Sequence, residues 1–141
     1  MKLPKHKTIF VDIDGTICEN RDDLRKEQLD TPIHYSDVKP YPKRIAAIND
    51  LYDSGHKIVY WTARGCVSGD DYTDLTKDQL LQWGAKYTDL QVGNKPHFDM
   101  YICDKSYNSE SWFARVQEGR PLKKEKNYPE KTTEENTLQI L

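Results

Sequence analysis

The stretch that decides the fold is Thr8-Ile9-Phe10-Val11-Asp12-Ile13-Asp14-Gly15-Thr16. Its first four residues are β-branched or aromatic, which predicts a buried strand that ends where the carboxylates begin. Because side chains alternate along an extended chain, Asp12 and Asp14 point to the same side. Two carboxylates held that close repel each other, so either one is protonated or a cation lies between them. An ordinary solvated turn is the competing interpretation.

Composition limits the class of protein. The chain has 141 residues and a formal net charge of -2, which predicts one soluble domain and argues against nucleic acid or an anionic membrane as a partner. No apolar run is long enough to span a membrane, and Asp12 and Asp14 interrupt any signal peptide. Cys18, Cys66 and Cys103 form no disulfide or zinc pattern, so we expect reduced thiols in a cytoplasmic protein.

Hydrophobic periodicity predicts alternating strands and helices beyond the first strand. A helix is expected from Pro42, and Gly55 would end it. A second helix is expected to begin at Thr76, because Thr76 and Gln79 match a capping box. In chain order, the expected elements are a strand at 8–11, the helix from Pro42, a strand at 57–62, the helix from Thr76 to Gly84, strands at 89–92 and 99–103, and a final helix containing Trp112, Phe113 and Val116.

Two polar segments interrupt this pattern. The insert at 19–41 is either disordered or a flap, and its position directly after the paired carboxylates favours a flap over a site. The Lys/Glu-rich segment 121–141 is expected to be a mobile tail or to order against a partner subunit. The predicted organisation is therefore one α/β domain at 1–120, with the insert inside it, followed by this tail.

In a mostly parallel sheet, polar groups at the carboxyl ends of the strands gather at one edge. Asp12, Thr62 and Asp104 each end a predicted strand, and Lys95 lies in the loop before the last one. Asp12, Asp14 and Asp104 offer hard oxygen ligands that suit Mg²⁺. Lys95 and Thr62 would bind the phosphate of a substrate.

This group suits phosphate transfer. Asp12 can attack as a nucleophile and form an aspartyl-phosphate, and Asp14 can give a proton to the leaving oxygen. Taken singly, each later residue has a structural alternative: Thr62 as a common strand end, Lys95 as a solvated loop residue, and Asp104 as part of a surface turn. Their order and placement together favour a site.

The order Asp12-Ile13-Asp14-Gly15-Thr16, Thr62, Lys95, Asp104 resembles the haloacid dehalogenase (HAD) superfamily of phosphohydrolases. The resemblance covers roughly residues 7 to 106. It implies a Rossmann-like three-layer fold, Mg²⁺ dependence, Asp12 as nucleophile and Asp14 as general acid and base. It further implies Thr62 and Lys95 as phosphate binders, Asp104 as a metal ligand, and a metal contact through the backbone carbonyl of Asp14.

The segments 61–65 and 95–105 are similar to small HAD phosphatases of capsule or surface-polysaccharide biosynthesis. In place of the paired acids frequent in those proteins, this chain has Cys103-Asp104, so one acid is missing. The short distance from the first motif to Thr62 leaves no room for a large cap domain. We therefore expect an open site, shielded by the flap or by another subunit of a homo-oligomer.

The function that the sequence predicts is Mg²⁺-dependent hydrolysis of a small phosphorylated sugar or polyol. Arg64, Arg21 and Tyr41 are candidate substrate contacts, with surface positions as the equal alternative. A phosphatase of nucleic-acid 3′ ends and a non-catalytic HAD-fold assembly module are the competing functions. Scattered basic residues argue against the first, and the complete set of aspartates argues against the second.

Overall fold

The fold is built on a small parallel sheet. The computed structural model describes residues 5–21 and 34–117. Within them, three strands lie side by side in the order β1 (Thr8–Val11), β2 (Lys57–Thr62) and β3 (Asp89–Val92). Both pairs are parallel, with Thr8 opposite Lys57 and Val59 opposite Asp89. The predicted α/β fold with an open, Rossmann-like parallel sheet is confirmed.

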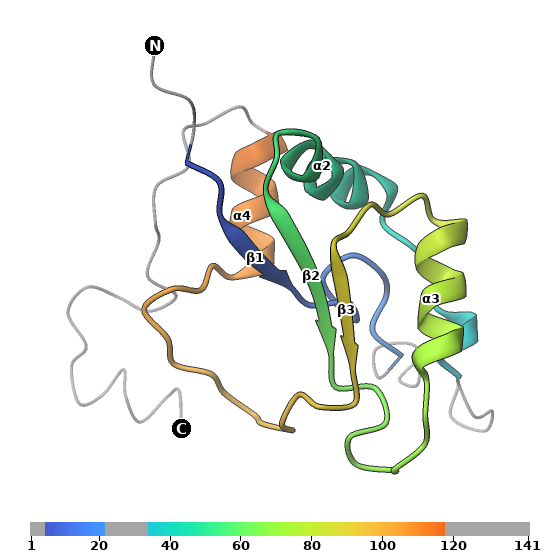
Figure 1. The fold of residues 1–141 in the computed structure, drawn as a ribbon. Helices are drawn as coiled ribbons and strands as arrows, with labels where there is room; N and C mark the ends of the chain where they lie inside the picture. The colour runs from blue at the N-terminus through green and yellow to red at the C-terminus, as the bar shows by residue number, and fades with distance from the viewer. Residues whose placement is uncertain (1–4, 22–33, 118–141) are drawn as a thin grey trace, which may run out of the picture. The chain divides into compact units, whose positions relative to one another are not determined.

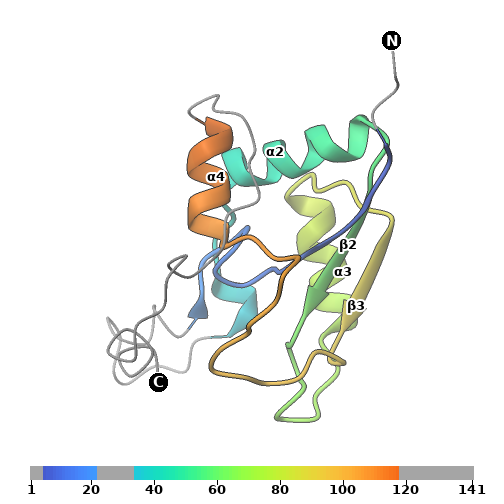
Figure 2. The ribbon, with the colours of Figure 1, turned by 90° about the vertical axis from the view of Figure 1, so that its left-hand side faces the viewer.

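Two helices connect these strands (Figure 1). Helix α2 (Pro42–Asp53) packs against β2, and α3 (Thr73–Gln82) packs against β3. Both connections lead to the next strand in the same direction, and right-handed crossovers then put both helices on one face of the sheet. Figure 2, which views the strands closer to edge-on, shows α2 and α3 on the same side of them.

The core of the sheet lies at β2, its central strand. Ile58, Tyr60 and Thr62 alternate along the strand and share one face, and all three are at most 1% exposed. Ile45 and Ile48, the buried residues of α2, are one helical turn apart. The β-branched and aromatic run that predicted β2 is therefore the run that is buried.

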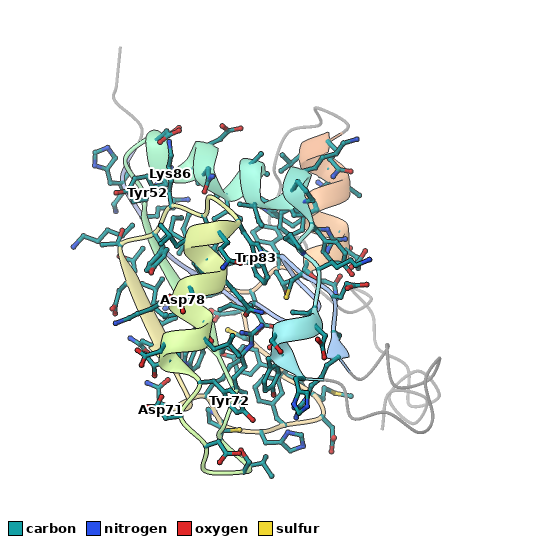
Figure 3. All side chains as sticks on the ribbon, turned by 90° about the vertical axis from the view of Figure 1, so that its right-hand side faces the viewer. Tyr52, Asp71, Tyr72, Asp78, Trp83 and Lys86 are labelled. Carbon is teal, nitrogen blue, oxygen red and sulfur yellow. The ribbon has the colours of Figure 1, made fainter. Side chains whose placement is uncertain are left out.

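The start of α3 differs from the prediction. The helix begins at Thr73, and the Asp71 carboxylate accepts hydrogen bonds from the Thr73 backbone N–H (2.9 Å) and hydroxyl (2.6 Å). Asp71 lies at this end of the helix and Trp83 at the other (Figure 3). Thr76, the predicted cap, instead lies within the helix, and its side chain is fully buried. A capping pattern is purely local, so it cannot reveal that Thr76 has a partner far away in sequence.

The chain divides into two compact units, Met1–Phe98 and Asp99–Leu141. In the second unit, α4 (Ser109–Gln117) forms where a helix was expected. The predicted strand at 99–103 is wrong, because these residues have no strand structure. The consecutive residues Tyr101 and Ile102 would point to opposite faces of a strand, yet both are largely exposed. Neither face is buried, so nothing favours an extended, paired conformation.

Both ends of the predicted flap are joined by hydrogen bonds. The Glu19 N–H donates to the Lys39 carbonyl (2.9 Å), and the Tyr41 N–H donates to the Ile17 carbonyl (2.8 Å). Between them, η1 (Tyr35–Asp37) forms a short 3₁₀ turn. Residues 22–33 of the flap and the predicted tail at 121–141 lie outside the described residues. No helix in the described part of the chain is long and apolar enough to cross a membrane.

Candidate active site

Three predicted site residues lie at the carboxyl edge of the sheet because each follows the end of a parallel strand. Asp12 follows β1, Thr62 ends β2, and Lys95 lies three residues beyond β3. After Asp12 the chain turns at Gly15, whose φ of 79° is a conformation that favours glycine. The Thr16 hydroxyl donates to Asp12 Oδ2 at 3.4 Å, which connects the end of this turn to the carboxylate at its start.

Asp12 lies beside Lys95. The Asp12 carboxylate is 41% exposed, and its Oδ1 is 3.2 Å from the Lys95 Nζ. The ammonium group also lies over the rings of Trp61 (5.3 Å) and Phe98 (5.8 Å), which contribute cation–π attraction. The site therefore presents an accessible carboxylate with a positive charge held next to it.

Asp14 has a different partner. Its Oδ2 accepts a hydrogen bond from Arg64 Nε (2.9 Å), and its Oδ1 accepts one from Arg64 Nη2 (2.8 Å). The Arg64 side chain is 0% exposed and that of Asp14 is 18% exposed. Two parallel charged hydrogen bonds of this kind are strong and fix the plane of the carboxylate. Asp14 is therefore held rigidly at the margin of the core.

The far side of the Arg64 guanidinium is anchored on α3. Arg64 Nη1 donates to Thr76 Oγ1 (3.2 Å) and to Gln79 Oε1 (2.5 Å). Gln79 Nε2 in turn donates to the Tyr35 carbonyl (2.7 Å), and the guanidinium lies 4.7 Å from the centre of the Tyr35 ring. A buried arginine needs this number of partners because an unpaired buried charge is very costly.

Sequence reasoning missed Thr76, Gln79 and Tyr35 as members of the site. One signal was present, because Thr76, Gln79 and Leu80 share one face of α3 by their spacing, and this face is buried. Polar residues on an inward face need polar partners. The identity of the partner could not be read from the sequence, because Arg64 lies in a different element.

Thr62 lies directly beneath the edge. It is 1% exposed, and its Oγ1 accepts a hydrogen bond from the backbone N–H of Arg64 at 3.2 Å. Gly65, the residue after Arg64, has a φ of 82°, and a Cβ there would collide with the Asp70 carbonyl oxygen. Thr62 and Gly65 thus shape the turn that directs Arg64 inward. Phosphate binding by Thr62 stays a prediction.

The three candidate substrate contacts, Arg64, Arg21 and Tyr41, lie in different surroundings. The Arg64 guanidinium is buried in the network with Asp14, so it does not face a substrate in this structure. Arg21 lies over the Tyr35 ring (4.0 Å), which makes it a neighbour of that network. Tyr41 is 37% exposed and precedes α2, with the Arg44 guanidinium 5.2 Å from its ring. Substrate contacts by Arg21 and Tyr41 stay predictions.

Cys18 makes the surroundings of the Asp14 carboxylate less polar. The buried thiol lies 3.6 Å from Asp14 Oδ1, and burial, followed by the charge of Asp14, raises the pKa of Cys18 to about 12. Cys18 is therefore a neutral thiol at any ordinary pH. Its neighbourhood is poorly hydrated, in contrast to that of Asp12.

Asp104 belongs to the second unit, so its pairing with Asp12 stays a prediction. Within that unit, the Lys105 N–H donates to Cys103 Sγ at 3.3 Å. A hydrogen bond from Tyr101, followed by this backbone bond, lowers the pKa of Cys103. The residue beside Asp104 is thus a partly exposed thiol with a lowered pKa.

The described residues offer Mg²⁺ few oxygen donors. Among residues 5–21 and 34–117, no group of three His, Cys, Asp or Glu side chains could hold a metal ion. Magnesium needs only one or two carboxylates, with waters and a substrate phosphate completing its shell. The accessible Asp12 carboxylate fits this pattern. The Asp14 carboxylate does not, because both its oxygens are bound by Arg64.

Comparison with known proteins supports the fold alone. No protein-family model matches this chain, and no curated protein matches its sequence. The crystal structure of a target protein from Vibrio cholerae is similar, with a TM-score of 0.61 and 19% sequence identity over 96% of each chain. Identity this low shows a shared architecture, and it carries no information about activity.

Proposed function

We propose that the chain is a Mg²⁺-dependent phosphomonoesterase of the HAD type that hydrolyses a small phosphorylated sugar or polyol. The observation that carries this proposal is the placement of the exposed Asp12 carboxylate 3.2 Å from Lys95 at the carboxyl edge of a parallel sheet. An accessible nucleophile with a neighbouring cation is what transfer of a phosphoryl dianion requires. Ligands of open α/β sheets also bind at this edge.

The proposed reaction has two steps. An Asp12 carboxylate oxygen attacks phosphorus, the bond from phosphorus to the leaving oxygen breaks, and Asp14, which enters this step in its protonated form, gives that oxygen its proton. Water then attacks the aspartyl-phosphate, gives a proton to Asp14, and releases inorganic phosphate and the Asp12 carboxylate. Lys95 stabilises the negative charge of the phosphoryl group in both steps.

Magnesium would be held by the carboxylates of Asp12 and Asp104 and by the backbone carbonyl of Asp14. When bound, it neutralises charge on the phosphoryl group and lets two anions approach each other. This chain supplies the rest: Asp12 as the nucleophile, Lys95 as a fixed positive charge and Asp14 as the proton carrier.

We further propose a cytoplasmic enzyme that works as a homo-oligomer in surface-polysaccharide biosynthesis. All three cysteines are free thiols, which suits a reducing compartment. The oligomer follows from the expected absence of a cap, since a neighbouring subunit would shield the site. The physiological sugar is the least constrained part of this proposal.

The test is phosphate release from a panel of sugar and polyol phosphates, with and without EDTA. We expect turnover that EDTA abolishes and Mg²⁺ restores, and none in Asp12→Asn. Faster turnover of a 3′-phosphorylated oligonucleotide than of every sugar phosphate would replace this substrate class. If no substrate is hydrolysed and no Mg²⁺ is bound, the assembly-module alternative takes precedence.

A further inference from the structure

We propose that Arg64 is a positioning residue for the proton-transferring carboxylate of Asp14, and that α3 holds Arg64 in place for this task. The inference rests on the proposed function. It concerns the chain's own hydrogen-bond network, which connects the turn after β1, the turn after β2, and α3.

The geometry determines which part of Asp14 remains available. A carboxylate has about four lone-pair positions. Arg64 uses one on each oxygen of Asp14, and the Cys18 thiol, 3.6 Å away, uses a second one on Oδ1. The two bonds from Arg64 fix the plane and the rotation of the carboxylate. Because the Asp14 side chain keeps 18% exposure, the remaining position on Oδ2 can face the reacting group. Arg64 therefore selects the direction from which Asp14 exchanges a proton.

Arg64 can do this only if it is itself immobile. Thr76 and Gln79 accept hydrogen bonds from Nη1, the one guanidinium nitrogen that does not donate to Asp14. Gln79 also binds the Tyr35 carbonyl, so its amide cannot rotate freely. Reacting groups must be held to within about 0.5 Å for efficient catalysis, and a supporting shell of this kind provides such precision.

The type of leaving group separates a positioning role from a purely structural one. An alkoxide leaving from a sugar phosphate is strongly basic and needs a proton as the bond breaks, whereas p-nitrophenolate leaves without one. A displaced Asp14 should therefore slow formation of the aspartyl-phosphate selectively for the sugar phosphate. This step is reported by kcat/KM, whereas kcat also contains the second step, in which Asp14 takes a proton from water with either substrate. Loss of folded protein, or damage to Asp12, would slow both substrates equally.

The experiment compares kcat/KM for the best sugar phosphate of the panel with kcat/KM for p-nitrophenyl phosphate, because this ratio reports the step in which the leaving group departs. In Arg64→Lys, whose ammonium cannot form the two parallel bonds, we expect kcat/KM for the sugar phosphate to fall about 100-fold. We expect kcat/KM for p-nitrophenyl phosphate to fall less than about fivefold. In an Asp14→Asn background, Arg64→Lys should cause no further selective loss.

Gln79→Met provides a second variant, because it removes one anchor of Arg64 and leaves Asp14 and Arg64 in place. It should shift the ratio of the two kcat/KM values in the same direction, by about tenfold. Lys86→Met is the matched control, since Lys86 forms an exposed ion pair with Asp53 outside the site. Its ratio should equal that of the wild type.

The outcomes are separable. Equal losses for both substrates in Arg64→Lys and Gln79→Met, with an active wild type, would overturn this inference and leave the proposed function intact. A selective loss that persists in the Asp14→Asn background would also overturn it, because Arg64 would then act by another route. A wild type that hydrolyses neither substrate would refute the proposed function itself.

Discussion

Asp12 and Asp14 are two residues apart, yet their surroundings differ in almost every physical respect. Asp12 is exposed at the edge of the sheet, and its cation comes from a loop lysine. Asp14 lies against the core, and its cation is an arginine with no exposed side-chain surface. In the first pair the carboxylate is 41% exposed to water although the Lys95 side chain is only 14% exposed, whereas in the second pair both side chains are largely buried and depend on a complete set of hydrogen bonds.

The difference teaches how one short turn can give two identical side chains different tasks. A nucleophile must move toward phosphorus and lose its partner as the bond forms, which a weak exposed pair permits. A proton carrier must keep one orientation through both steps, which a rigid pair with Arg64 provides. Substitutions at the two positions should therefore separate activity from stability.

The largest effect is expected at Asp12. Asp12→Asn keeps the shape of the side chain and removes the nucleophilic charge, so kcat should fall at least about 1,000-fold. The free energy of unfolding, measured by urea denaturation, should change by less than about 0.5 kcal/mol, because the carboxylate is exposed. A clear loss of stability would show that Asp12 is as structural as Asp14 and would abolish the contrast.

Asp14→Ala is expected to affect both properties. Activity should fall about 100-fold through loss of the proton carrier. The free energy of unfolding should fall by about 3 kcal/mol, since the charge of Arg64 is left buried without its partner. Urea denaturation beside Asp12→Ala provides the comparison. Equal stability of the two alanine variants would contradict the assignment of the buried pair.

Lys95→Met tests the pair with Asp12. Methionine keeps much of the chain length beside Trp61 and Phe98 but removes the charge, so kcat/KM should fall about 10- to 100-fold. The free energy of unfolding should change by no more than about 1 kcal/mol, because the Asp12 carboxylate that loses its partner is 41% exposed to water. Lys86→Met, which removes an exposed ion pair outside the site, is the control, and its kcat/KM should equal that of the wild type.

The smallest effect is expected at Tyr60, whose buried hydroxyl lacks the hydrogen-bond partners that the Arg64 guanidinium has. The Tyr60 hydroxyl is buried and has no hydrogen-bond partner among the described residues, and burial raises its pKa. Tyr60→Phe removes an unsatisfied group, so it should stabilise the fold by about 1 kcal/mol and leave activity unchanged. Destabilisation would reveal a partner for this hydroxyl, and thermal denaturation is sufficient to detect it.

The sequence predicted those features that depend on local patterns. Strands β1 and β2 follow from β-branched and aromatic runs, and the edge that holds Asp12 and Lys95 follows from parallel topology. The network of Arg64 could not be predicted, because Thr76 reads equally well as a helix cap and as a buried acceptor. The strand predicted at 99–103 is wrong for a different reason, since an apolar run forms a strand only if another element covers it.

The separation of Asp14 and Arg64 by 50 residues has a consequence for synthesis on the ribosome. At about 5–20 residues per second, Asp14 emerges roughly 3–10 s before its arginine, and Gln79 follows later still. During this interval the turn after β1 carries two neighbouring negative charges and no buried cation. The backbone hydrogen bonds of this turn are local, but the buried pair of Asp14 with Arg64 can be completed only after α3, which carries the partners of Arg64, has been synthesised.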